Sequence, residues 1–398
     1  MHLARRAWCR TYQTVFRIAL PVLPYTEPRI LAEEVPAVLQ KRSIHHVLIV
    51  TDPGIARLGL TAPLETALAS KGISAAVYAE TRANPTVSNV EEAASLYRES
   101  ACQAIIGFGG GSAMDCAKGV GARIAQPKKP INKMRGLLRI HRRLPLLIAV
   151  PTTAGTGSEV TLAAVITDDE THYKYPINDF VLIPRFAVHD PEFTRGLPAS
   201  ITGQTGMDAL THAIEGYITP GAWTMSDMFE LKAIELVAAH LRNVVEDGSD
   251  PVARNGMAEA QYIAGMGFSN VGLGIVHSMA HPLGAFYDTP HGVANALLLP
   301  YVMEYNAESP SRAKYLDIAR AMGVDTAGMS VDEGVAAAVR AVRDLSLSIG
   351  IPQRLHEIGV KEEDIPALAV AAFNDVCTGG NPRPTSVGDI EKLYRTAF

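Results

Sequence analysis

The chain has 398 residues, of which 47% are apolar and 19% charged, and its net charge at pH 7 is −5. At about 150 residues per domain, this length predicts two or three domains. The composition excludes a disordered or fibrous chain. Apolar runs such as 144–150 fall far short of the roughly 18 residues that span a bilayer, so no membrane partner is expected. The acidic charge gives no global basic field for nucleic acid.

Residues 1–26 form a basic N-terminal extension with four arginines and no acidic residue before Glu27. Starts rich in arginine and poor in acids occur in organelle transit peptides. A short basic extension, or a start codon placed too far upstream, is the simpler interpretation. A secretory signal fits less well, because Arg17 and Pro21 interrupt the apolar stretch.

The cysteines are scattered along the chain without any CxxC pair. This spacing argues against a disulfide framework and against a zinc ribbon. It favours a reducing, cytoplasmic location. The four positions are Cys9, Cys102, Cys116 and Cys377.

Residues 27–195 alternate between strand-like and helix-like segments. Expected strands are 46–51, 75–78, 104–108 and 146–150, with helices over 63–71, 90–99 and from about 113. Apolar strands without polar alternation, separated by helices, indicate an α/β domain with a parallel sheet covered on both faces. The basic run 128–143 lacks interleaved aromatic residues, so a solvated surface is favoured there over a nucleic-acid patch.

Residues 196–398 are expected to form an all-helical domain. Amphipathic segments dominate after a boundary near 193–198, and convincing strands are absent. The expected helices are 205–219, 225–247, 255–270, 293–305, 311–322, 331–349 and 363–376.

A glycine-rich turn follows the strand 104–108 and opens a helix. Its sequence, 107–112, is GFGGGS, and the helix contains Asp115 and Lys118. Glycines allow close backbone approach to a pyrophosphate, and a helix N-terminus offers free N–H groups. The turn is not a standard GxGxxG, so a plain Rossmann fold is doubtful. Asp52 ends the first clear strand, where a carboxylate could accept hydrogen bonds from a ribose. A turn residue before Pro53 is the alternative.

A loop dense in hydroxyl groups, 151–161 (PTTAGTGSEVT), comes directly after the strand 146–150. The carboxyl edge of a parallel sheet is where α/β folds bind ligands. A plain Ser/Thr/Gly loop is the alternative interpretation.

The residues that favour a metal site lie in the second half. Asp208 and His212 are spaced i, i+4 and share one helix face. Three further histidines lie within one 15-residue stretch of an apolar, glycine-rich region. They are His277, His281 and His291. Three imidazoles with one carboxylate suit Fe(II) or Zn(II). Spacing alone leaves open which of these three histidines is not a ligand.

Several long motifs resemble the iron-containing (group III) alcohol dehydrogenase family, over nearly the whole chain from about residue 27. Segments 218–223, 265–274 and 276–296 look most like its lactaldehyde reductase (1,2-propanediol oxidoreductase) branch. The motifs are GGGSAMDCAK (109–118), PTTAGTGSEVT (151–161), HDPEFTRGLP (189–198), GMDALTHAIEGYI (206–218), VHSMAHPLGAFYDTPHGVANA (276–296) and CTGGNPRPT (377–385).

The resemblance implies a dehydroquinate synthase-like fold, in which an NAD-binding domain precedes a helical metal-binding domain. It also implies a homodimer or a larger homo-oligomer. The implied metal ligands are Asp208, His212, His277 and His291, and His281 takes the position associated with proton relay. Positions matching NAD contacts are Asp52, Asn84, Gly109, Gly110, Gly111, Ser112, Asp115, Thr152, Thr153 and Thr156. Phe268 and Cys377 match positions that line the substrate cleft.

The implied activity is reversible hydride transfer between NAD(H) and primary alcohols or short aldehydes, with Fe2+ or Zn2+ polarising the substrate oxygen. Lactaldehyde reductases carry Asn where this chain has Ala163. The pocket is therefore expected to be more apolar, with plain primary alcohols preferred over strict 1,2-diols. Narrow lactaldehyde or 1,3-propanediol specificity is the alternative, and glycerol dehydrogenase-like polyol oxidation is less favoured. A non-catalytic NAD- or metal-binding protein is disfavoured, because neither a ligand nor the GGGS turn is lost.

Overall fold

The computed structural model describes residues 7, 9–11, 13–14, 29–170 and 174–398. The chain divides into two compact units. One is Thr26–Thr194, and the other is Arg195–Phe398 together with the N-terminal segment. Most of the predicted extension 1–26, including Arg5, Arg6 and Arg17, lies outside the described residues.

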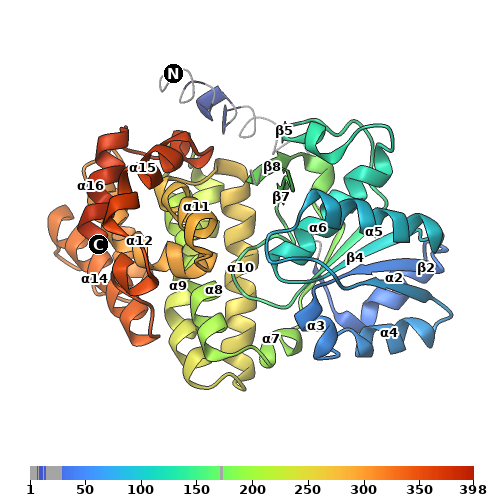
Figure 1. The fold of residues 1–398 in the computed structure, drawn as a ribbon. Coiled ribbons are helices and arrows are strands. Elements are labelled where there is room, and N and C mark those ends of the chain that lie inside the picture. Colours follow the sequence, from blue (N-terminus) through green and yellow to red (C-terminus); the bar gives the residue numbers. More distant parts are fainter. Residues whose placement is uncertain (1–6, 8, 12, 15–28, 171–173) are drawn as a thin grey trace. The chain divides into compact units, whose positions relative to one another are not determined.

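The first unit contains a six-stranded parallel sheet, as the alternating pattern predicts (Figure 1). The four expected strands are all present, and two short ones are added where two or three residues gave too little pattern to recognise. The order is β1-β9-β6-β4-β2-β3. The bounds are β1 Arg29–Ile30, β2 His46–Val50, β3 Ser74–Tyr78, β4 Ala104–Gly109, β6 Leu146–Pro151 and β9 Phe186–Val188.

Helices cover both faces of this sheet (Figure 1). Successive residues of β2 alternate between two apolar cores: Leu48 and Val50 pack with α5 and α6, whereas Val47 and Ile49 pack with α2, α3 and α4. A strand buried on both sides carries no polar alternation, which explains its sequence. The bounds are α2 Val35–Gln40, α3 Pro53–Arg57, α4 Ala62–Ala69, α5 Val87–Glu99 and α6 Gly111–Ala125.

A second, three-stranded sheet was not anticipated from the sequence. Its order is β5-β8-β7, and β7 pairs with β8 in the antiparallel sense. Burial alternates along both strands, so each contributes only two buried residues and gives a weak signal. The bounds are β5 Gly136–Leu137, β7 Ala163–Thr167 and β8 Lys174–Asn178.

The second unit is helical, and residues 195–398, all of which the structure describes, contain no strand. Two of its long helices, α11 and α16, were not predicted. Pro282 inside α11 breaks the helical pattern that would have revealed it. The short α7, Glu192–Arg195, spans the boundary between the two units in the sequence. The bounds of the helices that follow it are α8 Ala199–Ile218, α9 Thr224–Glu246, α10 Pro251–Val271, α11 Ile275–Tyr287, α12 His291–Asn306, α13 Tyr315–Ala321, α14 Val331–Ser348, α15 Ile365–Asn374 and α16 Val387–Ala397.

Gln13, from the N-terminal segment, packs on this helical unit. Its side-chain amide donates to Thr219 Oγ1 at 3.2 Å and to the Val271 carbonyl at 2.6 Å. Only 3% of Gln13 is exposed. At least this part of the basic extension is therefore an integral contact of the unit.

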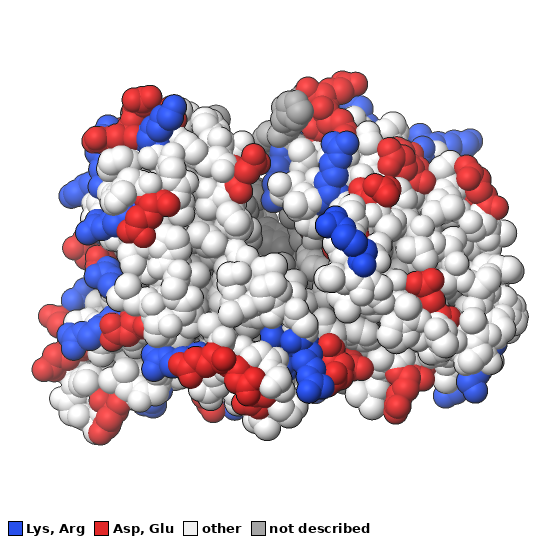
Figure 2. All heavy atoms as spheres, turned by 60° about the horizontal axis from the view of Figure 1, so that its bottom comes forward, with Lys and Arg blue, Asp and Glu red and all other residues white. Residues whose placement is uncertain are grey.

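The surface carries both signs of charge. On the face shown in Figure 2, acidic and basic side chains lie interspersed, in keeping with 36 basic and 41 acidic residues in the chain. Among the described residues, no helix has the length and apolar character needed to cross a membrane.

Candidate functional site

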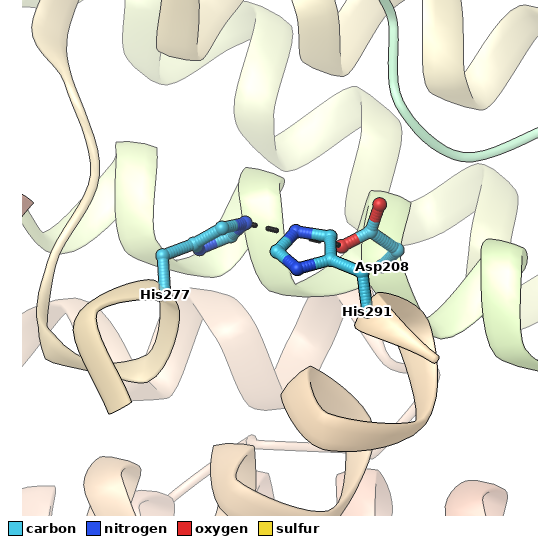
Figure 3. Close-up of side chains that lie close together, drawn as sticks. All are labelled: Asp208, His277 and His291. Atoms are coloured by element: carbon cyan, nitrogen blue, oxygen red, sulfur yellow. Dashed lines mark ion pairs between the residues drawn. The ribbon is translucent and has the colours of Figure 1, made fainter. Parts of the chain in front are cut away.

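Three side chains from three helices converge in the second unit (Figure 3). Asp208 comes from α8, His277 from α11 and His291 from the first turn of α12. Asp208 Oδ1 lies 3.9 Å from His277 Nε2 and 3.6 Å from His291 Nε2. One ligand atom of each residue lies within 4.8 Å of the others. A divalent cation of the zinc or iron type is bound by such donors.

The carboxylate of this cluster is buried but stays charged. Asp208 is 3% exposed. Burial by itself would raise its pKa, but the nearby histidines, with a hydrogen bond from Asn295, hold the pKa below its usual range. The Asn295 Nδ2 group donates to Asp208 Oδ1 at 2.7 Å. An anionic oxygen therefore faces two imidazole nitrogens in a buried place, which fits a cation.

Glu215 fixes the orientation of His277. Its Oε2 lies 2.6 Å from His277 Nδ1, and its Oε1 accepts the Val276 N–H at 2.7 Å. A carboxylate bonded to Nδ1 holds the proton there and leaves Nε2 unprotonated. In the structure this Nε2 lies 3.3 Å from Asn295 Nδ2, and an unprotonated imidazole nitrogen can coordinate a metal. Sequence reasoning missed Glu215. The signal was present, since positions 208, 212 and 215 share one face of a helix.

Replacing Glu215 with glutamine should weaken metal binding without removing any ligand. The expected loss in affinity is about 10–100-fold, because the amide no longer holds the imidazole as a charged acceptor does. Competition with a chromophoric chelator measures it. Glu235→Gln, an exposed change on α9 that affects only a contact with Lys232, is the matched control. Equal affinity in the two variants would contradict the orienting role.

His212 lies beside the cluster. Its ring stacks on those of His277 and Phe268, with centroids 4.6 and 4.2 Å away. Its nitrogens do not belong to the group whose ligand atoms lie within 4.8 Å of one another. The structure therefore brings together three of the four expected ligands, and metal ligation by His212 stays a prediction. Phe268, expected near the substrate, lies against His212.

His281 points to a different carboxylate. Its Nδ1 lies 2.8 Å from Asp375 Oδ2, and Asp375 Oδ1 accepts the Cys377 N–H at 2.8 Å. Burial would raise the pKa of Asp375, but His281 and these hydrogen bonds lower it. Burial raises the pKa of the Cys377 thiol well above its usual range. Sequence reasoning did not single out Asp375, which lies 94 positions from His281.

The predicted nucleotide-binding residues follow the carboxyl ends of parallel strands. Gly109 ends β4 with φ +151°, and a Cβ there would lie 2.7 Å from Ala113 Cβ. A Cβ on Gly111 would lie 2.9 Å from Thr156 Cγ2. The turn 109–111 therefore has room only for glycine at its first and last positions, which lets its backbone lie close to its neighbours. The turn opens α6, whose N-terminal N–H groups can bind phosphate.

Asp52 serves as the N-cap of α3. Its Oδ1 accepts the N–H groups of Gly54 and Ile55, at 2.8 and 3.0 Å. This is the turn role that the sequence also allowed. Oδ2 has no hydrogen bond among the described residues, so it can still accept one from a ribose.

Asp115 uses both of its oxygens within its own chain. They accept Ser158 Oγ at 2.8 Å and the Val165 N–H at 2.9 Å. Burial raises the pKa of Asp115. Its role in the structure is to fix the loop after β6, and its contact with NAD stays a prediction.

Lys118, to which the sequence analysis gave no role, completes this network. Its Nζ donates to Ser158 Oγ, Thr161 O, Thr161 Oγ1 and Ala163 O, at 2.7–3.1 Å. Burial lowers its pKa to about 8. A lysine three positions after the aspartate in GGGSAMDCAK, on the same helix face, was the available signal.

The remaining predicted cofactor residues surround the same strand ends. Thr152 is buried, and its N–H donates to Gly109 O at 3.0 Å. Thr153 Cγ2 lies 3.4 Å from where a Cβ on Gly110 would stand. Ser112 Oγ donates to the Ala83 carbonyl, and the exposed Asn84 accepts from Lys174.

Glu159 should make the stability of this unit depend on pH. Burial raises its pKa to about 7 from an ordinary 4.5. Between these values the folded state binds the proton and the unfolded state does not, so stability falls as pH rises. Near pH 5, Glu159→Gln should leave the thermal midpoint of unfolding nearly unchanged. Near pH 8, it should raise the free energy of unfolding by on the order of 1–3 kcal/mol. The exposed Glu99→Gln is the control. A gain in stability that Glu159→Gln shows only at low pH would contradict the prediction.

The chain matches the models of a known protein family over both of its units. The model for iron-containing alcohol dehydrogenase matches residues 29–191, and the model for the C-terminal part of the Fe-containing alcohol dehydrogenase family matches residues 202–398. The chain belongs to the iron-containing alcohol dehydrogenase family. The resemblance seen in the sequence motifs is thereby confirmed.

Relatives in this family agree over nearly the full length. Lactaldehyde reductase of Escherichia coli is 47% identical over 361 residues, which is 90% of this chain and 94% of the relative. NAD-dependent methanol dehydrogenase of Bacillus methanolicus is 37% identical, over 92% and 96% of the two chains. The crystal structure of a 1,3-propanediol oxidoreductase superposes with a TM-score of 0.91 at 39% identity, covering 94% and 98%. This iron-containing alcohol dehydrogenase therefore carries out metal- and NAD-dependent alcohol or aldehyde oxidoreduction.

Proposed function

We propose that this iron-containing alcohol dehydrogenase interconverts short primary alcohols and aldehydes, with Fe2+ held by Asp208, His212, His277 and His291. The observation that carries the proposal is the convergence of Asp208 Oδ1 with two imidazole Nε2 atoms, one of them held by Glu215. Zn2+ suits the same donors, and availability often decides between the two ions.

Each half of the chemistry is supplied by one unit. A bound divalent metal acts as a Lewis acid on the substrate oxygen, and NAD carries the hydride. The turn 109–111 and the hydroxyl groups of Thr152, Thr153 and Thr156 bind and orient the nucleotide. Ser112, Asn84 and Oδ2 of Asp52 complete its contacts.

His281 is proposed to hold and pass the hydroxyl proton. An imidazole changes charge near neutral pH, which suits it for this task. The bond from Nδ1 to Asp375 orients the ring and leaves Nε2 as the atom that takes the proton. Phe268 and Cys377 are proposed to line the substrate-binding place.

The substrate range is proposed to follow from Ala163, the first residue of β7. A methyl group offers no hydrogen bond to a second hydroxyl, and a polar partner is what discriminates such substrates. Ala163→Asn should raise kcat/KM for lactaldehyde relative to propanal by about 10-fold or more, as measured by NADH oxidation. Ala164→Gly, next to it but buried in the core, controls for a general loosening of β7. An unchanged ratio would remove Ala163 from the specificity argument.

Lactaldehyde reduction is the second candidate, favoured by the 47% identity to the Escherichia coli enzyme. A single panel separates the two. The protein is loaded anaerobically with Fe(II), or in parallel with Zn(II), and NADH oxidation is followed with lactaldehyde, propanal, butanal, 3-hydroxypropanal and dihydroxyacetone. Metal-dependent turnover of plain aldehydes as well as lactaldehyde supports the broad range. Turnover of lactaldehyde alone supports the second candidate, and no turnover with any aldehyde overturns both.

A reducing, cytoplasmic location and a homo-oligomeric state complete the proposal. The cysteines that the structure describes form no disulfide, which agrees with a reducing compartment. The oligomer rests on the family resemblance alone, and light scattering of the full chain measures it.

A further inference from the structure

We propose that His281, Asp375 and Cys377 form a second, zinc-type metal site beside the cluster of Asp208, His277 and His291. The His281 ring stacks on that of His291, with centroids 5.5 Å apart. The two groups share no residue, and all six side chains belong to the helical unit. One ligand atom from each of the three lies within 4.8 Å of the others.

The three donors are already close to the spacing that a tetrahedral zinc ion needs. Zinc binds imidazole nitrogen and carboxylate oxygen at about 2.0–2.2 Å and thiolate sulfur at about 2.3 Å, which places neighbouring donors about 3.5 Å apart. His281 Nδ1 and Asp375 Oδ2 now lie 2.8 Å apart, joined by a hydrogen bond. A small opening of this pair admits a cation in place of the shared proton.

Asp375 holds the group together in the absence of metal. One oxygen bonds His281, and the other accepts the Cys377 N–H at 2.8 Å, which fixes the backbone that carries the thiol. All three residues are partly exposed, so a cation can reach them. The site offers one imidazole, one carboxylate and one thiolate, and its fourth position is open to water. These donors favour zinc over magnesium or calcium.

Binding would change the protonation of the group in a defined way. The Sγ–metal bond forms as the thiol proton leaves to solvent. The proton shared by His281 Nδ1 and Asp375 moves to Nε2 of the same ring, so one proton is released with each metal ion bound. The imidazole of His281 becomes a ligand and can no longer hold a substrate proton. Zinc in excess of the first site should therefore inhibit turnover, a consequence that rests on the proposed role of His281.

Sulfur provides a signal that the first cluster cannot give. Asp208, His212, His277 and His291 offer only nitrogen and oxygen, so a thiolate-to-cobalt charge-transfer absorption arises solely from the second group. The full-length apoprotein is titrated anaerobically with Co(II), and the near-ultraviolet band, proton release and bound cobalt per chain are recorded. We expect two cobalt ions per chain, with the band following one of them.

Variants assign the band. Cys377→Ser should abolish it and leave one cobalt bound, and Asp375→Ala should weaken the cobalt affinity of this site by more than about 10-fold. Cys102→Ser, which changes a buried thiol of the other unit, should keep the band. Asp208→Ala should lose the other cobalt and keep the band, so a failure of the first site is distinguishable from a failure of the second.

Inhibition gives an independent readout. Each variant's rate in excess zinc is divided by its own rate without added zinc, so altered basal activity does not matter. Cys377→Ser should be less sensitive to zinc by about 10-fold or more in concentration. Absence of the thiolate band in the unmodified protein, or its loss in Cys102→Ser, would overturn the assignment.

Discussion

His277→Ala should abolish metal binding and activity together. His277 is 2% exposed, and its ring is held between Glu215 on one side and the cluster on the other. Removing it deletes one donor and leaves Oε2 of the buried Glu215 without its imidazole partner, which costs affinity as well as stability. Bound iron by elemental analysis and NADH oxidation measure the two losses.

His281→Ala should behave differently. It removes a ring that stacks on His291 but no donor of the first cluster, so iron should stay bound. Turnover should slow by about 10²–10⁴-fold, the usual contribution of a positioned acid or base. His356→Ala, an exposed histidine of the same unit that contacts the terminal Phe398, controls for the loss of an imidazole as such. If His281→Ala lost iron while His291→Ala kept it, the ligand assignment would be wrong.

Lys118→Met should destabilise the first unit by about 3–5 kcal/mol, the usual cost of removing one partner from a buried charged pair. The methionine retains most of the volume, but the Thr161 and Ala163 carbonyls lose their donor, and Asp115 loses the electrostatic interaction with the ammonium group. The loop 152–163 should then exchange its amide hydrogens faster, and NAD should bind more weakly. Urea unfolding followed by circular dichroism, hydrogen exchange and NADH fluorescence titration measure these effects.

Two further variants show whether charge is the cause. Lys71→Met, at an exposed position of the same unit, should change stability by less than about 0.5 kcal/mol. Adding Asp115→Asn to Lys118→Met removes the uncompensated carboxylate and should recover part of the loss. A double variant no more stable than Lys118→Met would assign the effect to packing instead.

Helices and strands could be predicted from the sequence where many successive residues are buried on one face or on both faces. β2 and β4 are buried on both faces and appear as uninterrupted apolar runs, so they were predicted together with the helices between them. β1 has two residues and β9 three, and such lengths carry no period. α11 was not predicted because its sequence is apolar and contains Pro282 inside the helix.

The residue types of the metal site could be predicted from the sequence, but the orientation of its side chains could not. The clustering of His277, His281 and His291 indicated a metal, but spacing could not separate the ligands, since all three are near one another in the chain. The structure separates them by their partners: Glu215 holds His277, and Asp375 holds His281. Those partners are 62 and 94 positions away, which no local pattern shows.

The Lys118 network also bears on the thermodynamics of cofactor binding. The loop after β6 is tied to α6 by its own lysine and aspartate, so its conformational entropy is lost when the chain folds and not when NAD arrives. Calorimetry of NAD binding should then show a heat-capacity change that reflects only the apolar surface covered by the nucleotide, without an added contribution from ordering a segment. The enzyme's affinity for its cofactor is in this sense set during folding.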